Sequence, residues 1–179
     1  MSKQAVNILL DADVMIHFVK GDRISVLIAL FPRRMVLLDR VDEELKNNKL
    51  VSVITENLIR IGSLTVVPFP SRDMKVVKEY AQLIKTKGKG ESACLAFCRH
   101  HSHIIASSNL SDIRDYCEEH QVAYLTTMDI LCIALHRKVL SEQECDTFIQ
   151  AVRASNSKLP DMRITQYRDR FFDRQKYDY

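Results

Sequence analysis

Several acidic side chains follow short apolar segments of this chain, and carboxylates brought together in this way can hold a metal ion. Asp11 and Asp13 come directly after the apolar residues 5–10, and Glu91 follows the glycine turn KGKG. Further acids and amides in comparable places are Glu43, Glu44, Asn109, Asp112 and Asp129. Neighbouring carboxylates repel one another unless a cation neutralises them, and Mg²⁺ and Mn²⁺ prefer such oxygen ligands. The pattern predicts a divalent-metal site if the fold gathers these segments.

Residues 5–19, AVNILLDADVMIHFV, are the segment around which the rest is organised. The apolar first half predicts a buried parallel strand, and the second half has helical spacing. Ligands bind at the carboxyl edge of open α/β sheets, which favours Asp11 for chemistry. Asp13 has a second interpretation as the N-cap of the following helix. Attraction of acids to a first helical turn is explanation enough for Asp39, Asp42 and Asp115.

The order of elements predicts a three-layer α/β/α fold with a central parallel sheet. Short apolar segments alternate with helical patterns of ten or more residues, which is typical of a parallel sheet covered by helices on both faces. We expect strands at residues 5–10, 35–38, 64–69, 103–107 and 122–125, and Pro68 and Pro70 indicate an edge position for the third strand or its end. A capping box, Ser141 with Glu144, predicts another helix start. We expect one domain, residues 1–155, and a C-terminal helix or tail, residues 156–179.

Composition limits the class of protein. The chain has 179 residues, 46% of them hydrophobic, and a net charge of +3, which neither requires nor excludes a polyanionic partner. No apolar run reaches the roughly 20 residues of a membrane span, and the first residues lead directly into a strand. We therefore expect a soluble, cytoplasmic protein. The five cysteines fall in apolar helical patterns, which indicates reduced, packed thiols.

Five segments in order, LLDADVMIHFV, VDEEL, KGKGESACLAF, IIASSNLSDIRDYC and AYLTTMDIL, resemble a PIN domain over about residues 6–151. The resemblance implies a nuclease that depends on Mg²⁺ or Mn²⁺ and cuts RNA. It also implies a prokaryotic toxin that is held by an antitoxin protein and acts as a homodimer.

The resemblance implies that Asp11, Glu44 and Glu91 are the metal-site carboxylates, with Glu43 as a substitute for Glu44. PIN domains usually carry a fourth acid after the strand that corresponds to HIIAS, at about residue 108 or 109. Here the sequence reads SSNLSD, so the expected acid is absent. Asn109 could offer a neutral oxygen ligand, or Asp112 could reach the site from one helical turn further on.

The leading hypothesis is a metal-dependent endoribonuclease in which an ion lowers the pKa of a water that attacks the phosphorus in line. Its catalytic residues would be Asp11, Glu44, Glu91 and Asp112, with Asn109 as a further metal ligand. Lys87, Lys89 and Arg114 would bind the RNA. The alternative is a catalytically impaired PIN-like module that binds RNA or a protein partner. Asp11 also resembles the nucleophile of haloacid dehalogenase phosphatases, although only fragments of their other motifs are present.

Two further clusters have open interpretations. His100, His101 and His103 are expected at the opposite end from Asp11, where they would cap a helix. The C-terminal residues are rich in arginine and aromatic side chains, which could stack on bases or pack on the body. The residues in question are Tyr167, Arg168, Arg170, Phe171, Phe172, Arg174 and Tyr177.

Overall fold

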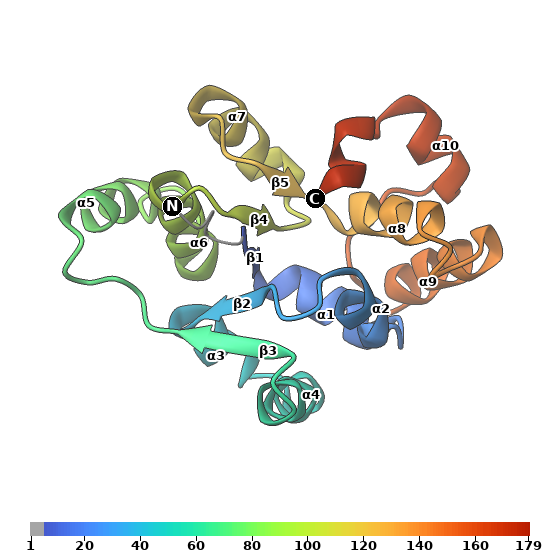
Figure 1. Cartoon of the computed structure of the whole chain (residues 1–179), viewed down its shortest axis with the longest axis horizontal. Coiled ribbons are helices and arrows are strands. Elements are labelled where there is room, and N and C mark those ends of the chain that lie inside the picture. The colour runs from blue at the N-terminus through green and yellow to red at the C-terminus, as the bar shows by residue number, and fades with distance from the viewer. Residues whose placement is uncertain (1–5) are drawn as a thin grey trace.

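The computed structural model describes residues 6–179, the side chains of residues 110–112 excepted. In this part of the chain, five parallel strands form one sheet in the order β3-β2-β1-β4-β5 (Figure 1). The strands are β1 (Ile8–Leu10), β2 (Met35–Leu38), β3 (Leu64–Val67), β4 (Ile104–Ala106) and β5 (Tyr124–Leu125).

Helices cover both faces of the sheet, so the predicted three-layer α/β/α architecture is confirmed. Helices α5, α6 and α7 lie on one face, and α1, α2, α8 and α9 lie on the other (Figure 1). The bounds are α1 (Ala12–Lys20), α2 (Ile24–Leu30), α3 (Asp39–Leu45), α4 (Lys49–Arg60), α5 (Met74–Leu83), α6 (Lys89–His101), α7 (Leu110–His120), α8 (Thr127–His136), α9 (Glu142–Ala154), α10 (Ile164–Arg170) and the 3-10 helix η1 (Arg174–Asp178).

The burial of each strand follows from its place in the sheet. Ile8, Leu9 and Leu10 of β1 are fully buried because β2 and β4 flank this strand and helices cover its two faces. At the edge strand β3, only Leu64 is buried, and Pro68 follows the last paired residue. The predicted edge position of this strand is confirmed.

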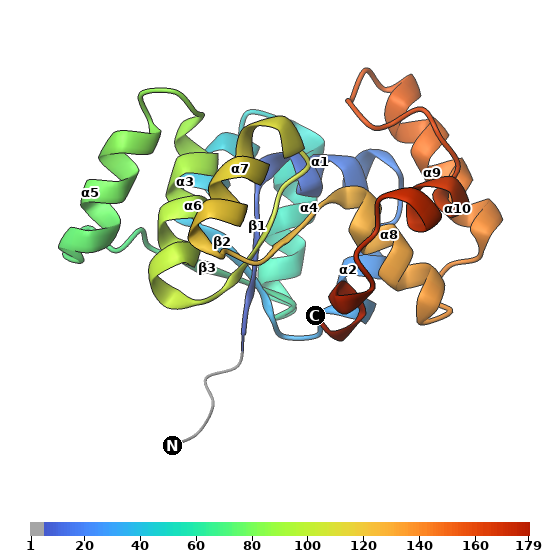
Figure 2. The same cartoon turned by 90° about the horizontal axis from the view of Figure 1, so that it is seen from above.

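All strands run in one direction, so their carboxyl ends meet at one edge of the sheet. Helices α1, α3, α7 and α8 begin at this edge, within a few residues of β1, β2, β4 and β5. The described N-terminal residues and the C-terminus lie toward the opposite edge (Figure 2). No helix in the described part of the chain is both long enough and apolar enough to cross a lipid bilayer.

The predicted C-terminal helix is present as α10, which contacts α8 and α9, and η1 follows it and contacts α8. Lys176 Nζ of η1 lies 2.8 Å from Asp129 Oδ2, and both side chains are buried. The Tyr167 hydroxyl of α10 donates to Asp129 Oδ1 at 3.0 Å. The capping box of Ser141 and Glu144 is also confirmed, at the start of α9.

Candidate active site

The junction between β1 and α1 places two aspartates side by side. Asp11 is the N-cap of α1, and its Oδ1 accepts a hydrogen bond from the Ala12 amide at 2.9 Å. The interpretation of Asp13 as this cap is therefore wrong, because Asp13 lies within the first turn. The side chain of Asp11 is only 6% exposed. The burial of this cap residue indicates that the Asp11 carboxylate packs against other groups of the chain, whereas Asp13 is half-buried.

The junction after β4 faces Asp13, because β1 and β4 are neighbours. The Ser108 amide donates to Asp13 Oδ2 at 2.8 Å, and the Ser108 hydroxyl is hydrogen-bonded to the Thr127 hydroxyl. His17 Nδ1 lies 3.0 Å from the same Thr127 oxygen. A neutral hydrogen-bond network thus occupies the place where the resemblance predicts a fourth acid.

The start of α6 approaches these aspartates closely because Gly90 has no side chain. A Cβ atom on Gly90 would lie 2.9 Å from Glu44 Oε2 and 3.6 Å from Asp11 Oδ1. Contacts between α3 and α6 bring Glu44 to this point. Glu91, the next residue of α6, is buried. Carboxylates from β1, α3 and α6 therefore converge at the carboxyl edge of the sheet.

These groups line a pocket of about 260 Å³, which we call the acidic pocket. Its lining residues are Asp11, Ala12, Asp13, Glu44, Thr86, Lys87, Gly88, Glu91 and Asn109. The structure thus brings together four of the predicted metal ligands and one predicted RNA-binding lysine. Asp13 joins them, and its helical first-turn position beside Asp11 was the sequence signal for it.

The remaining predicted residues lie elsewhere or are not described. The side chain of Asp112 lies outside the described residues. Lys89, the first residue of α6, is exposed and does not line the acidic pocket. Arg114 lies on α7, where its guanidinium pairs with Glu118 at 3.1 Å. Asp129, weighed as a further acid, is held by Thr126, Tyr167 and Lys176 instead.

Burial and mutual repulsion disfavour the charged forms of both aspartates. Burial raises the pKa of Asp11 to about 7, and the charges of Asp13 and, more weakly, Glu44 add to the rise. Burial likewise raises the pKa of Asp13 to about 6, against hydrogen bonds such as that from Ser108, and the charge of Glu91 adds to the rise. The buried Asp13 Oδ1 has no hydrogen-bond partner among the described residues.

The acids share a pocket without forming a closed ligand set. Among the described residues, no three His, Cys, Asp or Glu side chains are grouped tightly enough to hold one metal ion. Glu44 is exposed and has a long side chain, so among these acids it has the greatest freedom to move toward Asp11. What the pocket offers is buried negative charge with an orphaned carboxylate oxygen.

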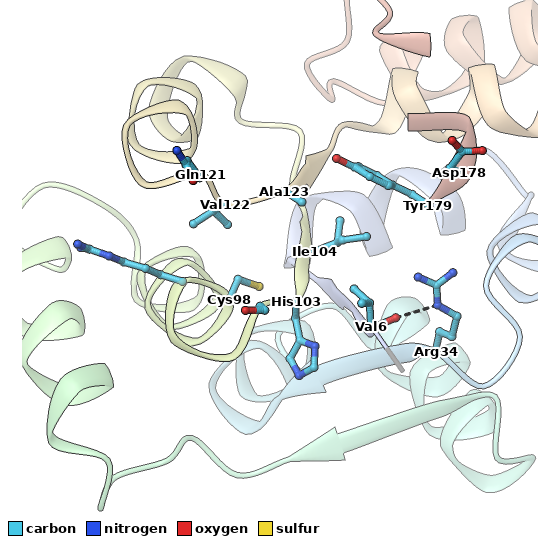
Figure 3. Close-up of a pocket in the computed structure, with 12 residues that line it drawn as sticks. Val6, Arg34, Cys98, His103, Ile104, Gln121, Val122, Ala123, Asp178 and Tyr179 are labelled. Atoms are coloured by element: carbon cyan, nitrogen blue, oxygen red, sulfur yellow. Dashed lines mark hydrogen bonds between the residues drawn. The ribbon is translucent and has the colours of Figure 1, made fainter. Parts of the chain in front are cut away.

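A larger pocket, of about 410 Å³, lies at the opposite edge of the sheet and contains no paired acids (Figure 3). His103, Arg34 and Tyr179 are among its lining residues, and Arg34 Nε donates to the Val6 carbonyl at 2.8 Å. The histidine cluster is therefore remote from Asp11, as predicted. The C-cap of α6 is Ser102, so the histidines lie beside the helix end without being the cap residue.

Comparisons with protein-family descriptions, with curated proteins and with solved structures returned no match to this chain.

Proposed function

We propose that this chain is a ribonuclease of the PIN type that depends on Mg²⁺ or Mn²⁺. The observation that supports the proposal is the acidic pocket, in which Asp11, Asp13, Glu44 and Glu91 meet beside Lys87. The PIN resemblance of the sequence supports RNA as substrate, and it alone supports a toxin role with an antitoxin partner and a homodimer.

The donor set of the pocket fits a hard divalent cation. The buried aspartates have raised pKa values, and Asp13 Oδ1 has no partner among the described residues, so a cation would relieve both costs. Since no three acids in the described part of the chain surround one point, Asp11, Asp13, Glu44 and Glu91 would hold the ion after Glu44 moves toward Asp11, with the amide oxygen of Asn109 beside them. When bound, the ion would lower the pKa of the attacking water and stabilise the negative charge of the phosphate.

The chain's own residues orient the reacting groups. The N–H donors of Ala12 and Ser108 fix one oxygen each of Asp11 and Asp13, and Asp13 Oδ1 has no hydrogen-bond partner among the described residues, which leaves that oxygen for a ligand. Lys87 at the rim brings positive charge to an approaching phosphodiester. Asp112 remains a proposed assistant of the metal site, on the resemblance and on its place in α7.

The second candidate function is a PIN-like module that binds RNA or a protein partner without cleaving. The observation that favours it is the neutral Ser108–Thr127 network at the place of the fourth acid. One carboxylate fewer lowers the negative charge available to a cation. The two candidates therefore differ in whether the pocket binds a metal ion.

Isothermal titration of Mn²⁺ into the full chain tests the proposal directly. We expect saturable binding to the wild type, and a loss of affinity of at least about tenfold in each of Asp11→Asn, Glu44→Gln and Glu91→Gln. Single-stranded RNA should be cleaved by the wild type with Mn²⁺ and by none of these variants.

Glu43→Gln is the matched control. Glu43 precedes Glu44 on α3, is equally exposed, and does not line the pocket, so its substitution should leave Mn²⁺ affinity unchanged. Absence of Mn²⁺ binding in the wild type, or equal losses in Glu43→Gln and Glu44→Gln, would refute the metal site and favour the binding module.

A further inference from the structure

The acidic pocket is one end of a longer hollowed surface. A second pocket, of about 650 Å³, shares Asp13 and Asn109 with it and extends along α1 to residues 157–160. A third pocket, of about 370 Å³, shares Pro160 with the second and lies between β5, α8 and the C-terminal residues. The three pockets therefore adjoin one another through shared lining residues.

The third pocket combines an open aromatic ring with cationic side chains. Phe171 lines it and is 62% exposed, which is unusual for a phenylalanine. Arg114 and Arg170, both exposed, line the same pocket. The other tail aromatics are used in packing: Tyr167 and Phe172 are buried, and the Tyr177 ring stacks on His136 at 3.9 Å. Phe171 is the most exposed of these side chains, and its ring contacts that of Tyr167 at 5.8 Å between centres.

The one carboxylate in this third pocket does not cancel the arginines. Asp129 is buried and already paired with Lys176 at 2.8 Å. The Lys176 ammonium also lies 4.0 Å from the centre of the Tyr124 ring, which covers that ring. Arg114 is paired with Glu118 at 3.1 Å, whereas Arg170 takes part in no ion pair among the described residues, so Arg170 is the main source of uncompensated positive charge at the mouth of this pocket.

The middle pocket continues the positive charge toward the acids. Lys20 Nζ donates to the Ser155 carbonyl at 3.0 Å and to the Ser157 hydroxyl at 2.9 Å, which holds the segment after α9 in place. Lys158, on the same segment, is exposed and lines this pocket. An extended polyanion lying along the three pockets would therefore meet Lys87 at the acidic pocket, Lys158 in the middle pocket, and Arg114 and Arg170 in the third.

We propose that the third pocket is a nucleotide subsite for single-stranded RNA, in which a base stacks on Phe171 and its phosphates contact Arg114 and Arg170. The proposal rests on the proposed function for the chemical class of the strand, and it adds where the strand leaves the acidic pocket. Aromatic stacking with adjacent cations is the general way in which proteins hold single-stranded nucleic acid without reading its sequence.

The experiment measures RNA binding by the full chain without metal, so that cleavage plays no part. A fluorescein-labelled oligouridylate of about ten nucleotides is titrated by fluorescence anisotropy in EDTA at several salt concentrations. We expect Phe171→Ala to lower the affinity about tenfold without changing the salt dependence. We expect Arg170→Ala to lower the slope of log affinity against log salt by about 0.7, and Arg114→Ala to do the same.

Two variants on α4 serve as matched controls. Leu50, 61% exposed, matches Phe171 as an exposed apolar side chain, and Arg60 matches Arg170 as an exposed arginine. Leu50→Ala and Arg60→Ala should bind as the wild type does, and Phe171→Tyr should retain the affinity because its ring still stacks. Equal affinity of Phe171→Ala and the wild type would overturn the subsite and leave the exposed ring to a protein partner.

The results separate this inference from the proposed function. Mn²⁺ binding at the acidic pocket without any RNA binding would overturn the subsite alone. RNA binding that depends on Phe171 in a chain that binds no Mn²⁺ would support the subsite and refute the metal-dependent nuclease.

Discussion

Asp11 and Asp129 are both buried aspartates at the start of a helix that follows a parallel strand, and their surroundings are opposite. Asp129 accepts hydrogen bonds from the Thr126 amide and the Tyr167 hydroxyl and pairs with Lys176. Asp11 accepts from the Ala12 amide and has Asp13 as its charged neighbour. Among the described residues, Asp11 has no lysine or arginine in an ion pair.

The difference shows that burial alone does not mark a functional acid. The charge of Asp129 is balanced within the chain, so this aspartate fastens the C-terminal residues to α8. The charge of Asp11 is unbalanced, so it costs the folded protein free energy unless something else is bound. An unbalanced buried acid in a pocket is the stronger candidate for function.

The largest expected loss of stability comes from removing the cation that pairs with Asp129. Lys176→Met removes the ammonium and leaves a buried carboxylate without its cation. We expect the free energy of unfolding to fall by about 3–5 kcal/mol, measured by urea denaturation at neutral pH.

The control for this prediction is an exposed ion pair. Lys46 lies 2.7 Å from Asp42 on α3, and its side chain is 57% exposed, so Lys46→Met should change the free energy of unfolding little. Adding Asp129→Asn to Lys176→Met should restore part of the loss, because no charge then stays buried. A cost of Lys176→Met as small as that of Lys46→Met would mean that Asp129 is not balanced by this lysine.

Removing the charge of Asp11 should instead raise the free energy of unfolding. Asp11→Asn keeps a side-chain oxygen for the α1 cap and removes a buried charge, so the metal-free protein should gain on the order of 2 kcal/mol near pH 8. The folded-state pKa of about 7 lies above the usual value of 3.8 for an aspartate. The contribution of this carboxyl group to stability is therefore present below pH 3.8 and is lost as the pH rises through 7. The gain should disappear in acid.

Asp39 provides the comparison for Asp11→Asn. It is the first residue of α3, after β2, and its Oδ1 accepts from the Phe69 amide at 3.1 Å. Asp39→Asn should give no stabilisation near pH 8, as measured by urea denaturation of both variants. Saturating Mn²⁺ should raise the stability of the wild type by about 3 kcal/mol at a hundredfold excess over its dissociation constant, and that of Asp11→Asn much less. A destabilised Asp11→Asn would show that the charge of Asp11 is balanced after all.

The sequence was sufficient for the features that depend on periodicity. The alternation of apolar segments and helical patterns predicted the parallel sheet and acids at its carboxyl edge, and the PIN resemblance selected Asp11, Glu44 and Glu91 among them. These three side chains do line one pocket. Such local patterns can be recognised without knowing which distant segments contact one another.

The hydrogen bonds and ion pairs that distinguish Asp129 from Asp11 depend on contacts between segments that are distant in the sequence. Lys176 is 47 residues from Asp129, and Thr127 is 110 residues from His17. Neither pairing has a local pattern, because each depends on how α1, α8 and the C-terminal residues pack. The same holds for Asp13, whose contact with Ser108 requires that β1 and β4 are neighbours.

A smaller effect is expected from restoring the fourth acid. Asn109 lines the acidic pocket, and Asn109→Asp would add a carboxylate there. We expect the affinity for Mn²⁺ to rise about tenfold and the metal-free protein to become less stable, because the imbalance around Asp11 grows. Titration calorimetry and urea denaturation measure the two effects. Asn47→Asp, an exposed change outside the pocket, should produce neither, and an unchanged affinity in Asn109→Asp would place residue 109 outside the ligand set.

The smallest expected change in Mn²⁺ affinity comes from a substitution at Gly90, where α6 lies close to the acids. The Cβ atom of Gly90→Ala would lie 2.9 Å from Glu44 Oε2, so the flexible glutamate must move away, while Val41 Cγ2 at 3.3 Å is displaced slightly. We expect Mn²⁺ affinity to fall about fivefold, and the free energy of unfolding to change by less than about 1 kcal/mol because alanine favours the helix.

Gly88 tests whether the loss comes from Glu44 or from the glycine turn as a whole. A Cβ atom on Gly88 would meet nothing within 4 Å, so Gly88→Ala should leave Mn²⁺ affinity unchanged in the same calorimetric titration. Equal affinities of the two alanine variants would remove Glu44 from the ligand set and leave Asp11, Asp13 and Glu91 as its acids. A loss confined to Gly90→Ala would instead show that an exposed glutamate on α3 completes a site whose other acids are fixed by β1 and α6.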